Sequence, residues 1–294
     1  MLCLCCISPI FMNGQDVKTT EIWLVDISNK DNKLTFGIPQ RITDNDHYDN
    51  QPCFSADGKF IYFASMPDTG QTDIMEYDTK KRYTRRITNT PESEYQPQPI
   101  PNNRNLLSVV RVNEELAQGF YSVNMDGTEI VNIAENQDSL AYYAWMNDST
   151  VGMYTLNGEV PTLEMFEILY QQSIVILDGG FGRCVQKIPG SSDLSFLMKK
   201  AKDDWRIYRY SFEEEDTLFI CNSFPGEEDF CWTRNGFLLI GSQGKLYMYD
   251  TQLGEKGKWK EVADYSKTIG NFYRLAISPA GDKLAIVSYI GAKP

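Results

Sequence analysis

The strongest constraint on the fold of this chain is an internal repeat of short hairpin-forming segments. The first kind of segment combines an apolar strand, a tight polar turn and a second apolar strand, and it is clearest in QPCFSADGKFIYFAS at 51–65. Alternation of β-branched or aromatic residues with polar ones around an Asp, Asn or Gly turn is typical of a β-hairpin. The other copies begin at intervals of about 43 to 46 residues, at 96–110, 142–155, 185–198, 230–242 and 275–288.

A second kind of hairpin segment alternates with the first. It reads TDIMEYDTKKRYTRRIT at 72–88, and its other copies occupy 20–43, 119–134, 163–177, 204–220 and 244–263. Two hairpins form a four-stranded sheet that stacks on similar neighbours, and a period of roughly 40 to 50 residues is typical of a β-propeller. We therefore predict an all-β fold, in which 16–294 form one six-bladed β-propeller of four-stranded antiparallel blades. Pairing of the C-terminal half-blade with the N-terminal one closes the ring.

The residues FSADGKFIYFAS followed by TDIMEYDTKKRYTRRIT resemble the TolB-like propeller repeat, with its Ser-Pro-Asp-Gly turn, Ile-Tyr-x-x-Asp strand and Arg-Ile-Thr ending. The resemblance covers nearly everything from Thr20 onward, and it is weakest at 185–198, where PGSSD replaces the turn. It implies a propeller, usually periplasmic or exported, that acts in protein interactions of the cell envelope. TolB itself also has an N-terminal α/β domain, for which this sequence has no room. The role of TolB in the Tol-Pal system is therefore not carried over.

The first residues indicate an export signal. The run from Leu2 to Met12 is apolar and too short to span a bilayer as a helix, and small polar residues follow near Gly14 and Gln15. We predict that 1–15 are an export signal truncated at its start, because the usual positively charged leader is missing. The mature chain is then periplasmic or otherwise exported, with no transmembrane helix. An apolar N-terminal strand or tail of a cytoplasmic protein is the alternative.

Four cysteines follow the predicted signal: Cys53, Cys184, Cys221 and Cys231. They show no C-x-x-C spacing, which argues against zinc and thioredoxin-like chemistry. In an oxidising compartment Cys221 and Cys231 are close enough in sequence to pair, and buried free thiols are the alternative.

Charge and residue inventory exclude several functions. A net charge of −12 would repel the phosphate backbone, so nucleic acid is not an expected partner. His47 is the one histidine, the G-x-S-x-G pattern is missing, and multi-histidine metal sites are impossible. We expect His47 to be a loop residue and no cofactor to be present. The closely spaced oxygens at 44–50 leave calcium as a weak alternative, since the glycine and the terminal glutamate of an EF-hand are missing.

Acidic residues concentrate on the connections between blades. These connections all emerge on one face, around the channel mouth, and we place them at 44–50, 89–95, 135–141, 178–183, 222–229 and 264–271. Together they contain 12 acidic and 2 basic residues, a net charge of −10 against −12 for the whole chain. Acidic loops around a channel with low-dielectric walls focus a negative potential, which attracts cations. The predicted ligand-binding residues are Asp49, Glu94, Asp138, Glu228, Asp229, Tyr48, Tyr95 and Phe272.

We therefore predict an exported, non-enzymatic binding or scaffold propeller that engages a protein or a small cationic ligand of the cell envelope. The alternative enzyme is a propeller hydrolase or lyase acting on carbohydrate or peptide, with carboxylates such as Glu94 and Asp138 as acid and base. Two further interpretations stay open. The acidity serves solubility alone, or the chain is an accessory subunit of an envelope complex.

Overall fold

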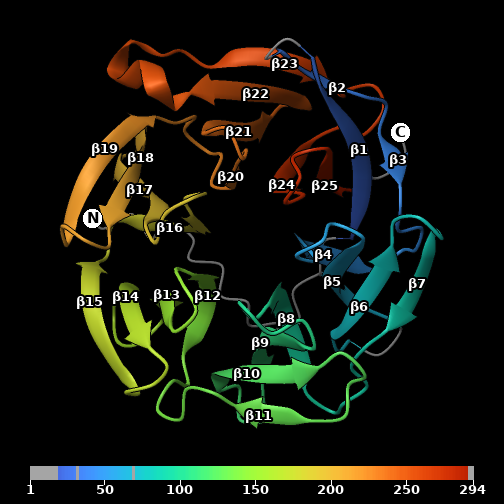
Figure 1. Ribbon diagram of the computed structural model, residues 1–294, viewed down its shortest axis with the longest axis vertical. Coiled ribbons are helices and arrows are strands. Elements are labelled where there is room, and N and C mark those ends of the chain that lie inside the picture. Colours follow the sequence, from blue (N-terminus) through green and yellow to red (C-terminus); the bar gives the residue numbers. More distant parts are fainter. Residues whose placement is uncertain (1–18, 31–32, 68–69, 291–294) are drawn as a thin grey trace.

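Antiparallel sheets stand around a central axis in a propeller-like ring (Figure 1). This computed structural model describes residues 19–30, 33–67 and 70–290. Four sheets contain four strands each, and their strands follow one another in space in chain order. They are β8 (Ser93–Pro99), β9 (Leu106–Val112), β10 (Gln118–Asn124) and β11 (Ile130–Asn132); β12 (Leu140–Trp145), β13 (Thr150–Thr155), β14 (Thr162–Glu167) and β15 (Gln172–Asp178); β16 (Phe181–Lys187), β17 (Leu194–Ala201), β18 (Asp204–Ser211) and β19 (Asp216–Asn222); and β20 (Phe230–Trp232), β21 (Phe237–Ser242), β22 (Lys245–Asp250) and β23 (Lys260–Asp264).

The remaining strands form one nine-stranded sheet. They are β24 (Phe272–Ile277), β25 (Lys283–Tyr289), β1 (Thr20–Lys30), β2 (Lys33–Phe36), β3 (Gln40–Arg41), β4 (Tyr48–Phe54), β5 (Phe60–Met66), β6 (Asp73–Asp78) and β7 (Tyr83–Arg86). The last described strand, β25, pairs with the first, β1, from Thr20 opposite Tyr289 to Asp26 opposite Lys283. Strand β1 also meets β4 at a parallel bridge between Thr20 and Tyr48. The all-β ring of antiparallel four-stranded sheets is thus confirmed, whereas six separate sheets were predicted and two of them are joined.

The apolar core lies between neighbouring sheets. One buried cluster joins Ile74 of β6 to Leu107 and Val109 of β9. The close approach of sheets also requires glycine at one point, since a Cβ on Gly152 of β13 would lie 2.2 Å from the side chain of Leu194 on β17. Stacking of neighbouring sheets is therefore what buries the apolar face that a single hairpin leaves exposed.

Two buried tryptophans connect neighbouring sheets at equivalent positions of the repeat. Trp145 Nε1 donates to Ser108 Oγ at 2.9 Å, and Trp232 Nε1 donates to Ser195 Oγ at 2.7 Å. Each tryptophan lies on the first strand of its sheet and each serine on the second strand of the preceding sheet. The aromatic position of the first repeat segment therefore serves the contact between sheets.

The Arg-Ile-Thr ending of the second segment also has a structural role. Thr88 Oγ1 accepts a hydrogen bond of 2.8 Å from the backbone N–H of Ile74. Arg86 forms an ion pair with the buried carboxylate of Asp73. The copy at 20–43 repeats both contacts. The motif thus holds the fourth strand against the third and neutralises a buried acid.

The structure also bears on the predictions about helices, cysteines and membrane spans. The sequence favoured no helix, and the described chain adds a short 3-10 helix, η1 (Thr251–Lys256), inside the copy at 244–263. Cys221 and Cys231 are free and buried, so the thiol alternative holds. The predicted signal at 1–15 lies outside the described residues. None of the described helices has the length and hydrophobicity of a membrane span.

Candidate functional site

Two adjoining cavities lie along the axis, where the first strands of all the sheets converge. The axial cavity, of about 490 Å³, is lined by strands β4, β8, β12, β16, β20 and β24 and by turn residues such as Arg234 and Pro279. The mouth cavity, of about 420 Å³, is lined by 226–229 and by Gln243, Asn271, Phe272, Tyr273 and Tyr289. Arg183 and Asp229 line both cavities. The mouth cavity therefore lies on the face of the predicted connections, and the axial cavity extends to the turns on the opposite side.

Bulges decide which side chains of the first strands face the axis. The pairing of a first with a second strand shifts register at five places in four of the sheets, at Asn50/Cys53, Tyr95/Gln98, Leu140/Tyr142, Phe181/Val185 and Phe272/Arg274. Gln51 and Gln96 sit in two of these bulges with φ of 55° and 50°, a region that residues other than glycine rarely adopt. Each bulge breaks the in-out alternation of its strand just where the chain reaches the channel.

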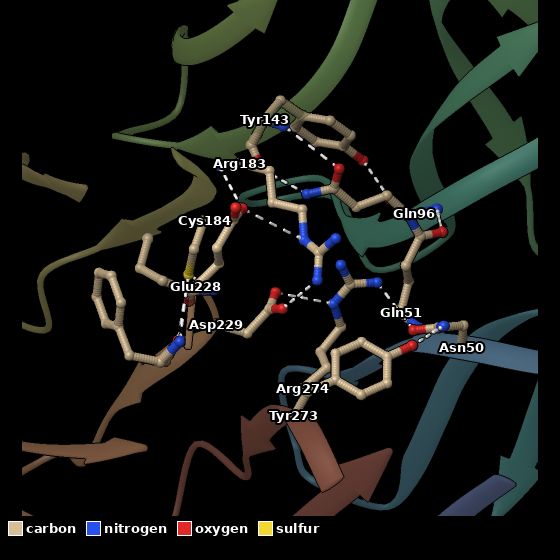
Figure 2. Close-up of polar contacts among 12 residues, drawn as sticks. Asn50, Gln51, Gln96, Tyr143, Arg183, Cys184, Glu228, Asp229, Tyr273 and Arg274 are labelled. Atoms are coloured by element: carbon tan, nitrogen blue, oxygen red, sulfur yellow. Dashed lines mark hydrogen bonds and ion pairs between the residues drawn. The ribbon is translucent and has the colours of Figure 1, made fainter. Parts of the chain in front are cut away.

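An ion cluster of two arginines and one aspartate stands where the cavities meet (Figure 2). Arg183 Nη2 donates to Asp229 Oδ2 at 2.7 Å, and Arg274 Nε donates to Asp229 Oδ1 at 3.2 Å. Arg274 Nη1 donates to Asn50 Oδ1 at 2.8 Å. The three charged residues come from the starts of β16, β20 and β24, so the cluster connects three sheets across the axis.

Burial and the arginines act in opposite directions on the carboxylate of this cluster. Burial raises the pKa of Asp229, but the charges of Arg183 and Arg274 outweigh it and hold the pKa below its ordinary value. Asp229 in turn raises the pKa of Arg183. Burial also raises the pKa of the neighbouring Tyr273 to about 12. At neutral pH the cluster thus holds two guanidinium groups, one carboxylate and neutral tyrosine.

Amides and a tyrosine continue the polar network on the other side of the axis (Figure 2). The backbone N–H of Gln96 donates to Gln51 Oε1 at 2.8 Å, and Gln96 Nε2 donates to the carbonyl of Tyr143 at 2.7 Å. Tyr143 Oη donates to the carbonyl of Gln96 at 2.9 Å. The recurrence of Gln-Pro at 51–52 and 96–97 is the sequence signal that could have predicted this network.

The mouth cavity combines carboxylates with aromatic rings. Lys199 Nζ pairs with Glu228, and Asp229 is bound by the two arginines. Burial raises the pKa of Glu227, whose carboxylate takes part in no ion pair found among the described residues. Tyr273 and Tyr289 stack with ring centroids 4.6 Å apart and an angle of 17° between the planes.

The structure brings three of the predicted site residues together. Glu228, Asp229 and Phe272 line the mouth cavity. Tyr48 and Tyr95 are half-buried and pack against the apolar cluster of Ile74, outside both cavities.

Three predicted acids lie outside both cavities. Asp49 and Glu94 are fully buried, and Asp138 is exposed on the connection before β12. Burial raises the pKa of Glu94 to about 7, and Thr90 Oγ1 donates to its Oε1 at 2.5 Å. The expectation that these acids face an open mouth together is therefore wrong for Asp49 and Glu94. Charge counting by segment could not show that they turn inward.

His47 is half-buried on the connection before β4 and lines neither cavity. No group of three or more His, Cys, Asp or Glu side chains in the described part of the chain is placed to hold a metal ion.

The likeness of this chain to known proteins lies in its fold. No protein-family model matches the sequence, and no curated protein matches it. Among solved structures, a protein of Agrobacterium tumefaciens described as a TolB superposes with a TM-score of 0.70 at 12% identity, over 94% of this chain and 100% of that one. This chain has the TolB-like β-propeller fold. TolB from Acinetobacter baumannii gives a TM-score of 0.60 at 8% identity, over 92% of this chain and 64% of that one.

A propeller enzyme shares the same fold. Oligogalacturonate lyase in complex with manganese gives a TM-score of 0.58 at 12% identity, over 88% of this chain and 82% of that one. At such identities the likeness shows the fold alone, because one fold hosts many functions. The function of this TolB-like propeller therefore depends on the residues of its own cavities.

Proposed function

We propose that this chain is an exported, non-enzymatic binding or scaffold propeller that takes a cationic group of a protein or small ligand into the mouth cavity. The observation that carries the proposal is the lining of this cavity by Glu227, Glu228 and Asp229 against one cation, Arg183. The stacked pair of Tyr273 and Tyr289 lies in the same wall. Carboxylates beside aromatic faces attract an ammonium or guanidinium group by charge and by cation-π contact.

In this proposal, Glu227 is the acid that pairs with the cationic group of the ligand. Glu228 and Asp229 already have cationic partners within the protein, whereas Glu227 has none in the described chain. Burial and the nearby charge of Asp229 raise its pKa, and only a hydrogen bond with Ser242 opposes them. An incoming cation would supply a compensating charge.

The ring that holds the cavity has six blades. Among the described residues, β1 and β4 pair at the single parallel bridge between Thr20 and Tyr48, and on either side of it the strands pair antiparallel. Dividing the nine-stranded sheet there gives one blade of β4 to β7 and a closing blade built on β24, β25 and β1. With the four separate sheets this matches the six copies of each repeat segment.

A peptide titration tests the cationic site. The probe is acetyl-Gly-Lys-Gly-Lys-Gly-amide, and its control replaces both lysines with glutamine. We expect Glu227→Gln to weaken binding of the lysine peptide by about tenfold or more, the effect of losing a hydrogen bond between charged groups. Glu213→Gln, an exposed acid outside both cavities, is the matched control and leaves binding unchanged. Equal affinity of Glu227→Gln and the unchanged protein, or of the two peptides, would refute the proposal.

A second candidate function is a hydrolase or lyase acting on carbohydrate or peptide. Glu227 and Asp229 line one cavity with pKa values moved in opposite directions, as in enzymes that divide acid and base roles between two carboxylates. Against it, both oxygens of Asp229 are engaged by arginines. Turnover of an oligosaccharide or peptide that disappears in Glu227→Gln would support the enzyme. No turnover across both substrate classes would leave binding as the function.

Export rests on the apolar run at 2–12 and on the likeness to TolB. Fractionation of the source cells checks it, and recovery of the full chain from the cytoplasm would contradict it.

A further inference from the structure

We infer that the axial cavity is a second binding site, for a ligand that bears a carboxylate group. Its charged lining is opposite to that of the mouth cavity: Lys187, Arg234, Arg183 and Arg274 face one acid, Asp229. The first two are exposed at the far rim, while Arg274 is deep, with its side chain 14% exposed. An anion entering from the turns would therefore pass two cations before reaching the paired arginines.

The arginines keep many donors available. Each guanidinium has five N–H groups, so the pair has ten. The hydrogen bonds found among the described residues occupy three of them, two to Asp229 and one to Asn50. Arg183 Nε is buried, has no hydrogen-bond partner in the described chain and lies 3.8 Å from Glu228 Oε2. The two arginines therefore have N–H groups left for a second acceptor while Asp229 stays bound.

The charge of the ion cluster also favours an anionic ligand. Arg183 and Arg274 carry two positive charges, and Asp229 between them carries one negative charge. The ring of Tyr273 lies 5.7 Å from the Arg274 guanidinium carbon, which compensates part of the excess. A partly buried positive charge without a full counter-charge is costly, and a bound anion reduces that cost.

The geometry of the two arginines suits a carboxylate. Asp229 already presents this group to both arginines, each through one oxygen, and the planar fork of a guanidinium suits a carboxylate plane. Trp145 and Trp232 in the cavity wall give the rest of the ligand an apolar surface and give the experiment an optical signal.

Succinate is the probe, and its neutral diamide, succinamide, is the matched control ligand. Calorimetry and tryptophan fluorescence report binding, and Trp145 and Trp232 are the two of the five tryptophans that line this cavity. We expect saturable binding of succinate that weakens with added salt, and no binding of succinamide. Arg274→Lys keeps the charge but loses the fork, and it should weaken succinate binding by about tenfold to a hundredfold.

Two rim variants keep the test decisive if Arg274→Lys fails to fold. Arg234→Gln and Lys187→Gln change exposed side chains and should each weaken succinate binding by about two- to threefold through lost attraction. Lys202→Gln, exposed and outside both cavities, should have no effect. Equal binding of succinate and succinamide, no saturable succinate binding, or unchanged affinity in both rim variants would overturn the inference. Unchanged affinity of Arg234→Gln for the lysine peptide separates this site from the mouth cavity.

Discussion

Replacing Asp229 with asparagine removes the buried carboxylate that Arg183 and Arg274 share. Both oxygens of Asp229 are bonded, at 2.7 Å to Arg183 and 3.2 Å to Arg274, and its side chain is 7% exposed. Removing one partner of a buried ion pair leaves the other charge uncompensated and typically costs about 3–5 kcal/mol. Because about 1 kcal/mol lowers the unfolding midpoint of a chain of this size by about 2 °C, we expect a fall of about 6–10 °C at neutral pH.

The loss of stability in Asp229→Asn should also depend on pH in a defined direction. The arginines hold the pKa of Asp229 below its ordinary value, so the folded state binds this proton less readily than the unfolded one. The stabilisation is present above the ordinary aspartate pKa and is lost as pH falls through the folded value. The gap between Asp229→Asn and the unchanged protein should therefore be widest near neutrality and narrow on acidification.

Urea and thermal unfolding followed by circular dichroism measure this gap. Asp204→Asn is the matched control, because Asp204 pairs with Arg206 at 2.6 Å on the surface, and exposed pairs contribute about 0–1 kcal/mol. An Asp229→Asn protein within about 1 kcal/mol of the unchanged protein at neutral pH would refute the argument that the cluster is a buried, interdependent unit.

Three further predictions concern groups outside the cavities or in their walls. Burial raises the pKa of Glu94 to about 7, so the folded state favours its protonated form, and the stability that this group contributes is present at low pH and lost as pH rises through that value. In urea unfolding, Glu94→Gln should therefore be more stable than the unchanged protein at pH 8 but not at pH 5. An equal change in the free energy of unfolding at both pH values would contradict this prediction. Trp232→Phe removes the 2.7 Å bond to Ser195 and should cost about 1 kcal/mol, whereas no change in the urea midpoint would show that the bond between sheets contributes nothing. Thr88→Val keeps the side-chain shape but removes the hydroxyl that accepts the Ile74 N–H at 2.8 Å, so the free energy of unfolding should fall by about 1–3 kcal/mol in the same assay. Thr88→Ser retains the hydroxyl and is the control.

The sequence predicted the sheets well because each hairpin carries its own signal. Alternation and turn residues are local, and the copies at 51–65 and 275–288 both became pairs of strands, β4 with β5 and β24 with β25. Even the weak copy at 185–198 folds as β16 and β17. The sequence did not indicate that β1 and β4 would be bridged at Thr20 and Tyr48, because a single bridge between two residues does not change the hydrophobic pattern of either strand.

The site was harder to predict because its residues depend on bulges and on partners from other strands. Arg274 follows a register shift after Phe272, so strand alternation could not assign it to the channel. Glu94 was counted as an exposed loop acid, yet Arg111 of the adjacent strand lies 3.3 Å from it and the carboxylate is buried. Acidic residues at the mouth were predicted, but the cations that neutralise some of them come from strands distant in sequence.

We propose that this propeller binds ligands on its axis, in two cavities of opposite charge. A crystal structure of the protein grown with succinate and the lysine peptide tests it most directly. We expect a lysine ammonium beside Glu227 and the stacked rings of Tyr273 and Tyr289, and a succinate carboxylate on Arg183 and Arg274. Both ligands bound on the outer surface, with neither group at the axis, would contradict the account.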